Sequence, residues 1–147
     1  MAGENIVVYG TSKTLEANGG SCATGSIAAA DDSSYNRSTD GSNYPDAEVV
    51  LSLAYATATG IEGKIVNILY AEQNVSGTND EQAPETNYKP KVLCSFAVND
   101  VTATQYFRKV VRNVPAEFLA WLHNDGTGQT ISAGWTLSII PRSNKAA

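Results

Sequence analysis

The sequence predicts an all-β fold, an antiparallel sandwich or barrel, from three observations. Several segments alternate side chains with a period of two and are rich in β-branched and aromatic residues. Turn-forming Gly, Pro, Asn and Asp residues separate these segments at fairly regular intervals. The chain shows no alternation of helical and strand patterns, which a parallel sheet would need. Its 147 residues suit one domain, 1–147.

Four segments carry the alternation most clearly, and each is expected to form a strand. In each segment one set of alternate residues is strongly apolar. The segments are Glu48–Ala56, with Val49, Leu51, Leu53 and Tyr55 on one face; Lys64–Glu72; Lys91–Asn99, with Val92, Cys94, Phe96 and Val98 on one face; and 135–140, with Trp135, Leu137 and Ile139 on one face.

The segment Val114–His123 fits two patterns. Pro115 could begin a helix, and Phe118 and Trp121 have nearly helical spacing. The same residues also alternate as a strand would, and the turn-forming residues 124–126 follow them. We expect a strand, with a helix as the alternative.

Two long polar stretches, Ala30–Asp46 and Asn74–Pro90, interrupt the pattern and are expected to form loops, which at this length are usually functional or mobile. Tyr35 and Tyr44 lie in the first stretch, where aromatic rings can anchor contacts, stack on sugars or cover the core. The two ends, 1–9 and 141–147, are possible arms.

The first stretch also carries four aspartates, Asp31, Asp32, Asp40 and Asp46. Oxygen-rich loops bind hard cations such as Ca²⁺, but the spacing here matches no calcium-binding pattern. A solvated acidic loop is the favoured interpretation, and no metal or other cofactor is expected.

Composition excludes several classes of protein. Charged residues make up 17% of the chain, the formal net charge is −5 and the pI is near 4.7, so the chain should repel nucleic acid. Its apolar runs are far shorter than the roughly 20 residues of a membrane span. The first residues lack the pattern of a signal peptide, so we expect synthesis in the cytoplasm, with Cys22 and Cys94 as reduced thiols.

The chain offers little for catalysis. Its only histidine, His123, would need a carboxylate and a nucleophile beside it, and no Gly-x-Ser-x-Gly motif is present. The sequence therefore predicts a protein that is not an enzyme.

Basic residues cluster once, at Arg108, Lys109 and Arg112. On a strand, Arg108 and Arg112 would share a face, with Tyr106 and Val110 beside them. Such a stripe could dock on an acidic partner, since arginine is enriched at interfaces. It could equally be a solvated face or a protected edge strand.

Several short blocks resemble small structural proteins of tailed-bacteriophage virions, specifically capsid cement (decoration) proteins. The likeness spreads over most of the chain. The blocks are Val8–Gly19, Ala30-Asp31-Asp32, Tyr44-Pro45-Asp46-Ala47, Asn99-Asp100-Val101-Thr102, Val114-Pro115 and His123–Leu137.

The resemblance implies a jelly-roll-like β-sandwich without catalytic residues. It further implies assembly on the outside of the phage head, where the protein would clamp neighbouring copies of the major capsid protein. Cement proteins associate with themselves, and here a homodimer is favoured, with a trimer as the alternative. A second hypothesis is a tail- or fibre-associated sandwich that binds host-surface carbohydrate. Its candidate aromatics are Tyr35, Tyr44, Trp121 and Trp135, of which Trp135 is expected in the core because it lies in an alternating strand.

Overall fold

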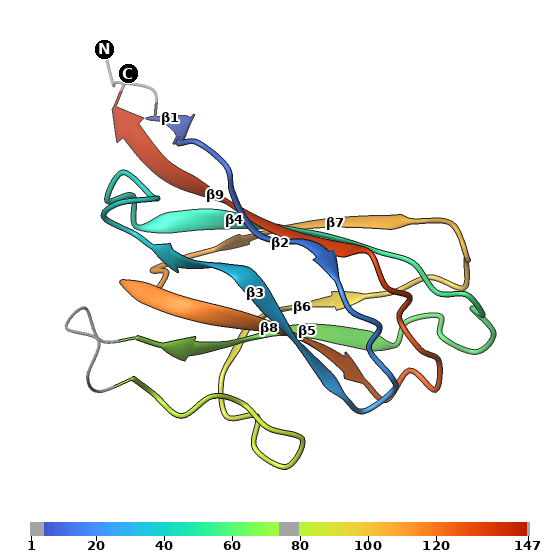
Figure 1. Cartoon of the computed structure of the whole chain (residues 1–147). Coiled ribbons are helices and arrows are strands. Elements are labelled where there is room, and N and C mark those ends of the chain that lie inside the picture. Colours follow the sequence, from blue (N-terminus) through green and yellow to red (C-terminus); the bar gives the residue numbers. More distant parts are fainter. Residues whose placement is uncertain (1–4, 74–79, 147) are drawn as a thin grey trace.

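Nine strands follow one another along residues 5–73 and 80–146, the part of the chain that the computed structural model describes (Figure 1). Between the strands the chain forms turns and irregular loops. The described residues include no helix that could span a bilayer. The strands are β1 (Asn5–Tyr9), β2 (Lys13–Gly19), β3 (Ile27–Asn36), β4 (Asp46–Leu53), β5 (Ile65–Glu72), β6 (Val92–Ala97), β7 (Gln105–Val111), β8 (Glu117–Asp125) and β9 (Trp135–Ala146).

The strands form two antiparallel sheets packed face to face. One sheet has the order β1-β9-β4-β7, with β2 also paired to β9, and the other has the order β3-β8-β5-β6. The pairs β2–β9, β3–β8, β4–β7 and β5–β6 show that the chain folds as one long hairpin, with its tip between β5 and β6. Wrapping such a hairpin into two sheets gives the jelly-roll strand order.

The core lies between the sheets and is built from the alternation predicted above. Val49, Leu51 and Leu53 on β4 are at most 1% exposed, and the first two lie opposite Ile139 and Leu137 of β9. Full burial of one such aliphatic side chain contributes about 1.5–3 kcal/mol. The predicted inward faces of β4 and β9 are therefore confirmed.

Val92 departs from its predicted face and is 47% exposed, whereas Cys94 and Phe96 are buried as expected. The ladder between β5 and β6 shifts its register at Ile68 and Leu69, where a bulge inserts one residue. Because side chains alternate with a period of two, a one-residue shift turns every following side chain to the opposite face.

The stretch Ala30–Asp46 is not a long loop, and that expectation was wrong. Its first part continues β3 to Asn36, and only the residues from Arg37 to Pro45 form a turn. The register of β3 against β8 shifts between Ala30 and Tyr35, so a bulge absorbs the polar residues within this edge strand. Of the second stretch, residues 74–79 lie outside the described residues, and 80–90 is irregular as expected.

The two predicted arms pair with each other. Asn5–Tyr9 runs antiparallel to Arg142–Ala146, and Figure 1 shows this ribbon extending beyond the body of the sandwich. Residues 1–4 and 147 lie outside the described residues. Val114–His123 contributes most of β8, which confirms the strand in place of the helix.

The loops that follow β2, β4, β6 and β8 gather at one end of the sandwich (Figure 1). Asn124, which is fully buried, joins two of them: its Nδ2 donates to the Cys22 carbonyl at 3.0 Å and to the Gln129 carbonyl at 2.7 Å. Its Oδ1 accepts from the Thr127 hydroxyl at 2.7 Å. These bonds fix this end of the molecule.

Candidate docking surface

The predicted basic cluster lies on β7, which ends the five-stranded sheet. Tyr106, Arg108 and Val110 lie opposite the outward residues of β4, and so they face away from the core. Arg112 follows the end of the strand. Arg108 therefore shares a strand face with Tyr106 and Val110 as expected, whereas Arg112, which was expected on the same strand face, lies beyond the end of β7.

Glu48 on β4 holds this outer face together. Its Oε1 accepts from the Tyr9 hydroxyl at 3.0 Å, its Oε2 pairs with the Arg108 guanidinium, and Arg142 Nε lies 3.9 Å from Oε1. Burial alone would raise the pKa of Glu48, but the hydrogen bonds from Arg108 and Tyr9 and the two guanidinium charges outweigh it, so the pKa is lowered. One ionised carboxylate thus links β1, β4, β7 and β9.

Asp46 plays the same part for Arg112. Its Oδ2 lies 3.5 Å from Arg112 Nη1, and its Oδ1 accepts from the Asn113 backbone N–H at 3.0 Å. Both arginines of the cluster are therefore partly neutralised by β4, although their side chains remain 57% and 67% exposed. The sequence near the cluster does not indicate Glu48 and Asp46 as its partners, because only the pairing of β4 with β7 brings them to the cluster.

Lys109 does not share the outer face. It lies opposite Val49 and points toward the other sheet, where Nζ donates to the Ser95 carbonyl of β6 at 3.0 Å. The ammonium also lies 6.0 Å from the centre of the Phe96 ring. Lys109 therefore bridges the two sheets at their open side.

Around these charges the outer face exposes aromatic and aliphatic groups. Tyr106 is 79% exposed, Tyr9 is 50% exposed and Val110 is 36% exposed. Tyr and Arg are enriched among the residues that dominate binding energy at protein interfaces. We call this group, Tyr9, Tyr106, Arg108, Val110 and Arg112, the docking surface.

Tyr35 cannot contact a partner, so its proposed role in docking or sugar stacking was wrong. It is fully buried on β3 and packs against Phe118 at 5.5 Å between ring centres. Burial raises its pKa to about 12. A Cβ on Gly41 would lie 2.1 Å from its hydroxyl oxygen, so only glycine lets the turn close over this ring.

The other aromatic candidates divide in the same way. Tyr44 is half-buried in the turn before β4, and Trp121 is half-buried on the outer face of β8. Trp135 is 1% exposed, and its Nε1 donates to the Gly20 carbonyl at 2.8 Å. Two of the four candidate aromatics, Tyr35 and Trp135, therefore belong to the core, as was expected for Trp135.

His123 lies in a hydrogen-bonded row on the outer side of the four-stranded sheet. Its Nδ1 is 3.1 Å from Asn67 Nδ2, and Asn67 Oδ1 accepts from the Ser95 hydroxyl at 2.5 Å. Burial lowers the pKa of His123, against the opposing charge of Asp125. Because an amide separates Ser95 from the imidazole, this row is not a nucleophile–base pair.

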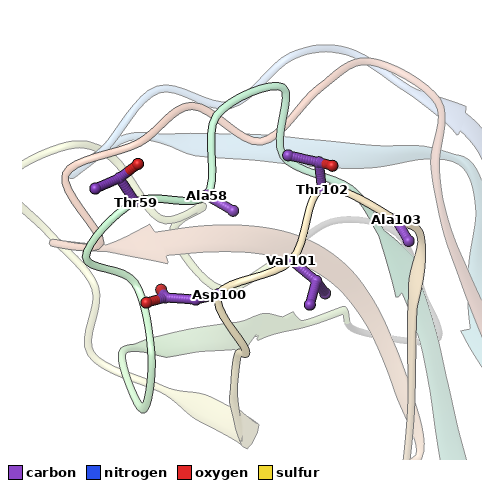
Figure 2. A pocket seen from close by; sticks show the side chains of 6 residues that line it. All are labelled: Ala58, Thr59, Asp100, Val101, Thr102 and Ala103. Atoms are coloured by element: carbon purple, nitrogen blue, oxygen red, sulfur yellow. The ribbon is translucent and has the colours of Figure 1, made fainter.

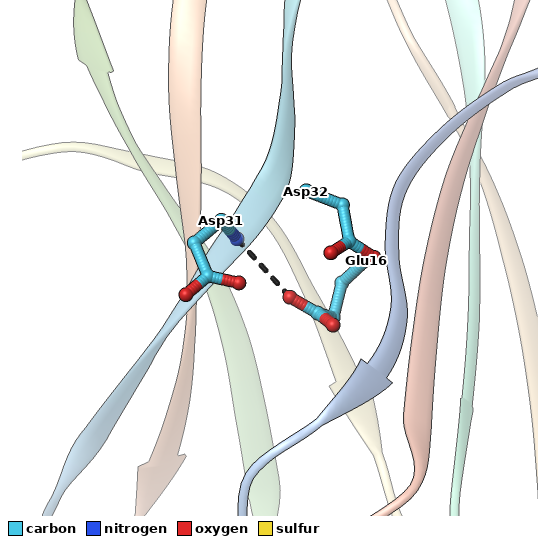
Figure 3. Close-up of side chains that lie close together, drawn as sticks. All are labelled: Glu16, Asp31 and Asp32. Carbon is cyan, nitrogen blue, oxygen red and sulfur yellow. Dashed lines mark hydrogen bonds between the residues drawn. The ribbon is translucent and has the colours of Figure 1, made fainter.

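Glu16, Asp31 and Asp32 bring ligand oxygens within 4.8 Å of one another between β2 and β3 (Figure 3). Glu16 Oε2 accepts from the Asp31 N–H at 3.1 Å, and Asp32 Oδ2 accepts from the Ala17 N–H at 2.7 Å. Three carboxylates could in principle hold a cation, but two of them already serve backbone donors.

The four aspartates expected in one acidic loop are spread apart. Asp40 pairs with Lys13 at 3.2 Å, and Asp46, the first residue of β4, pairs with Arg112. Only Asp31 and Asp32 remain together. The single acidic loop was therefore a wrong expectation, because its residues belong to β3, a turn and β4.

A surface hollow of about 620 Å³ lies between the loop after β4 and the loop after β6 (Figure 2). Its one carboxylate, Asp100, accepts the Ile61 and Glu62 backbone N–H groups, both at 2.6 Å. The rest of the lining is small or hydroxylic: Ala58, Thr59, Val101, Thr102 and Ala103. Asp100 thus fastens the two loops to each other, and the residues that line the hollow include no acid–base pair.

No family model, curated protein or solved structure matches the chain. The chain is an antiparallel β-sandwich with the jelly-roll strand order, and its outer face presents arginine and tyrosine on a rigid sheet.

Proposed function

We propose that this protein is a non-enzymatic structural protein of the capsid cement type. It binds the outer surface of a phage head and stabilises the contacts between subunits of the major capsid protein. The observation that carries the proposal is the docking surface, where Tyr106 is 79% exposed on the same strand face as Arg108, and where Glu48 and Asp46 hold the guanidinium groups of Arg108 and Arg112.

Rigid placement of these side chains favours docking. A side chain that is already ordered loses less conformational freedom on binding, so more of its contact energy appears as affinity. Arg108 is held by Glu48, and Tyr9 is tied to the same carboxylate. Tyr106 and Val110 then add apolar area beside the charges.

The proposed role follows from mass action. A protein that binds only the assembled shell stabilises that shell by its binding free energy. Modest contacts repeated by symmetry add to one another, so no single contact needs to be tight. In this proposal the protein lies on the virion exterior, in several copies that also contact one another.

The test is binding to heads that lack the protein. Purified protein is mixed with such heads, the heads are pelleted, and bound copies are counted per major capsid subunit. We expect saturation at a simple ratio and greater resistance of the heads to heat. Tyr106→Ala should lower the affinity about tenfold or more, as loss of a central aromatic contact does.

Tyr88→Ala is the matched control, because Tyr88 is also exposed, at 39%, but lies outside the docking surface. It should bind as the wild type does. Absence of binding to heads, with retention on a glycan array, would overturn the proposal in favour of a carbohydrate-binding tail protein. If Tyr106→Ala binds heads as tightly as the wild type does, the docking surface is not the contact with the shell, and that part of the proposal fails.

A further inference from the structure

The sandwich has two open sides, and side chains close each of them differently. β2 and β3 end their sheets on one side, and β7 and β6 end them on the other. On the first side Glu16 and Asp32 cross between the sheets and accept backbone N–H groups. On the second side Lys109 crosses between the sheets and donates to a backbone carbonyl.

This difference leaves opposite charges on the two sides. The first side, which we call the acidic edge, carries Glu16, Asp31 and Asp32. Asp31 and Asp32 are exposed, and within residues 5–73 and 80–146 none of the three forms an ion pair with Lys, Arg or His.

The second side, which we call the basic edge, carries Lys109, with Arg108 and Arg112 bordering it. The carboxylates of Glu48 and Asp46 lie on the neighbouring strand with side chains only 8% and 12% exposed. The cations are therefore what this side presents to an approaching molecule. Lys109 forms no ion pair within the part of the chain that the structure describes.

We propose that copies of this chain associate side by side, with the acidic edge of one against the basic edge of the next. A two-fold axis at either edge would bring like charges together, which costs energy when they are desolvated. A head-to-tail contact instead joins three or more copies, in a ring where its rotation closes and in an open filament where it does not. The inference rests on the proposed function only in that both require neighbouring copies.

The edges also explain why the contact is specific. Each edge has its exposed backbone groups partly taken up by side chains, so it resists uncontrolled strand pairing. Charge then selects which edge meets which. The chain's net charge of −5 opposes any contact that lacks such complementarity.

The test uses the full chain in sedimentation velocity experiments at low salt, about 0.05 M, and high salt, about 0.5 M. We expect wild type to sediment at low salt as about three copies or more and to dissociate at high salt. Asp31→Lys and Lys109→Glu should each abolish association. The double variant should recover it, because each interface again joins opposite charges.

Circular dichroism and thermal unfolding show whether each variant is folded. Lys109→Met replaces Lys109→Glu if the latter does not fold, and it should also weaken association. A monomeric wild type at low salt would overturn the proposal, as would association that Asp31→Lys leaves unchanged. If the wild type is monomeric but binds heads, this proposal fails and the cement proposal stands. If the wild type associates but does not bind heads, the cement proposal alone fails.

Discussion

The two open sides of this sandwich cover the backbone groups of their edge strands with side chains of opposite charge. Edge strands carry backbone groups without partners in the sheet. At β2 and β3 the carboxylates of Glu16 and Asp32 accept backbone N–H groups, whereas at β6 and β7 the Lys109 ammonium donates to a backbone carbonyl. Protecting donors therefore leaves a negative edge, and protecting acceptors leaves a positive one. The charge of each edge follows from the backbone groups that it covers.

The largest effect is expected at Glu48, which supports the basic side from the neighbouring strand. Glu48→Ala leaves Arg142, 18% exposed, without its carboxylate and frees Arg108 and Tyr9. The free energy of unfolding should fall by about 3 kcal/mol, as when one partner of a largely buried ion pair is removed. Urea denaturation measures it. A loss no larger than that of Arg108→Ala would show that Glu48 is not the hub.

Glu16 is the corresponding group on the acidic side. It is 3% exposed and accepts the Asp31 and Asn18 N–H groups, so Glu16→Ala strands two backbone donors. We expect a loss of about 2 kcal/mol in the free energy of unfolding. Glu16→Gln keeps one acceptor oxygen and should lose about half of that. An unchanged midpoint in Glu16→Ala would mean that water replaces the carboxylate.

A pH titration examines the row that begins at the basic edge, from Ser95 through Asn67 to His123. Burial lowers the pKa of His123 below its ordinary 6.5, so near and below that pH the unfolded chain binds more protons than the folded chain. Stability should therefore fall as the pH is lowered from about 7 through 6.5. His123→Gln should flatten this part of the profile. An equally steep profile in that variant would assign the dependence to another group.

Lys109→Met should have the smallest effect on the isolated chain. The bond to Ser95 is exposed, so its loss should cost about 0.5 kcal/mol or less. The free edge of β6 becomes more available for strand pairing, and thioflavin fluorescence during long incubation reports it. The matched Asp31→Asn variant keeps its backbone bond to Glu16 and should not aggregate faster.

The sequence patterns predicted the strands that carry an alternating apolar face well and the polar edge strand β3 poorly. In β4, β6, β8 and β9 one face meets the core, so their side chains record the period, whereas β5 is apolar and buried on both faces. β3 was taken for a loop because its polar residues, Asp31 and Asp32 among them, sit at an open edge. Local pattern says little where neither face is fully covered.

The candidate surface was predicted in part for the same reason. Arg108 and Arg112 stood out as a dense cluster, but their partners lie some 60 positions away on β4. Pairing between distant strands decides such contacts, and alternation does not encode it. Tyr35 looked like a surface residue because its loop was assigned wrongly.

An electron cryomicroscopy map of heads saturated with this protein tests the account most directly. The account predicts that the outer face of the β9-β4-β7 sheet, with Tyr106 and Arg108, lies against the shell. It also predicts that the acidic edge of each copy adjoins the basic edge of the next. A map in which Tyr106 faces solvent, or in which the protein does not decorate the shell, would contradict it.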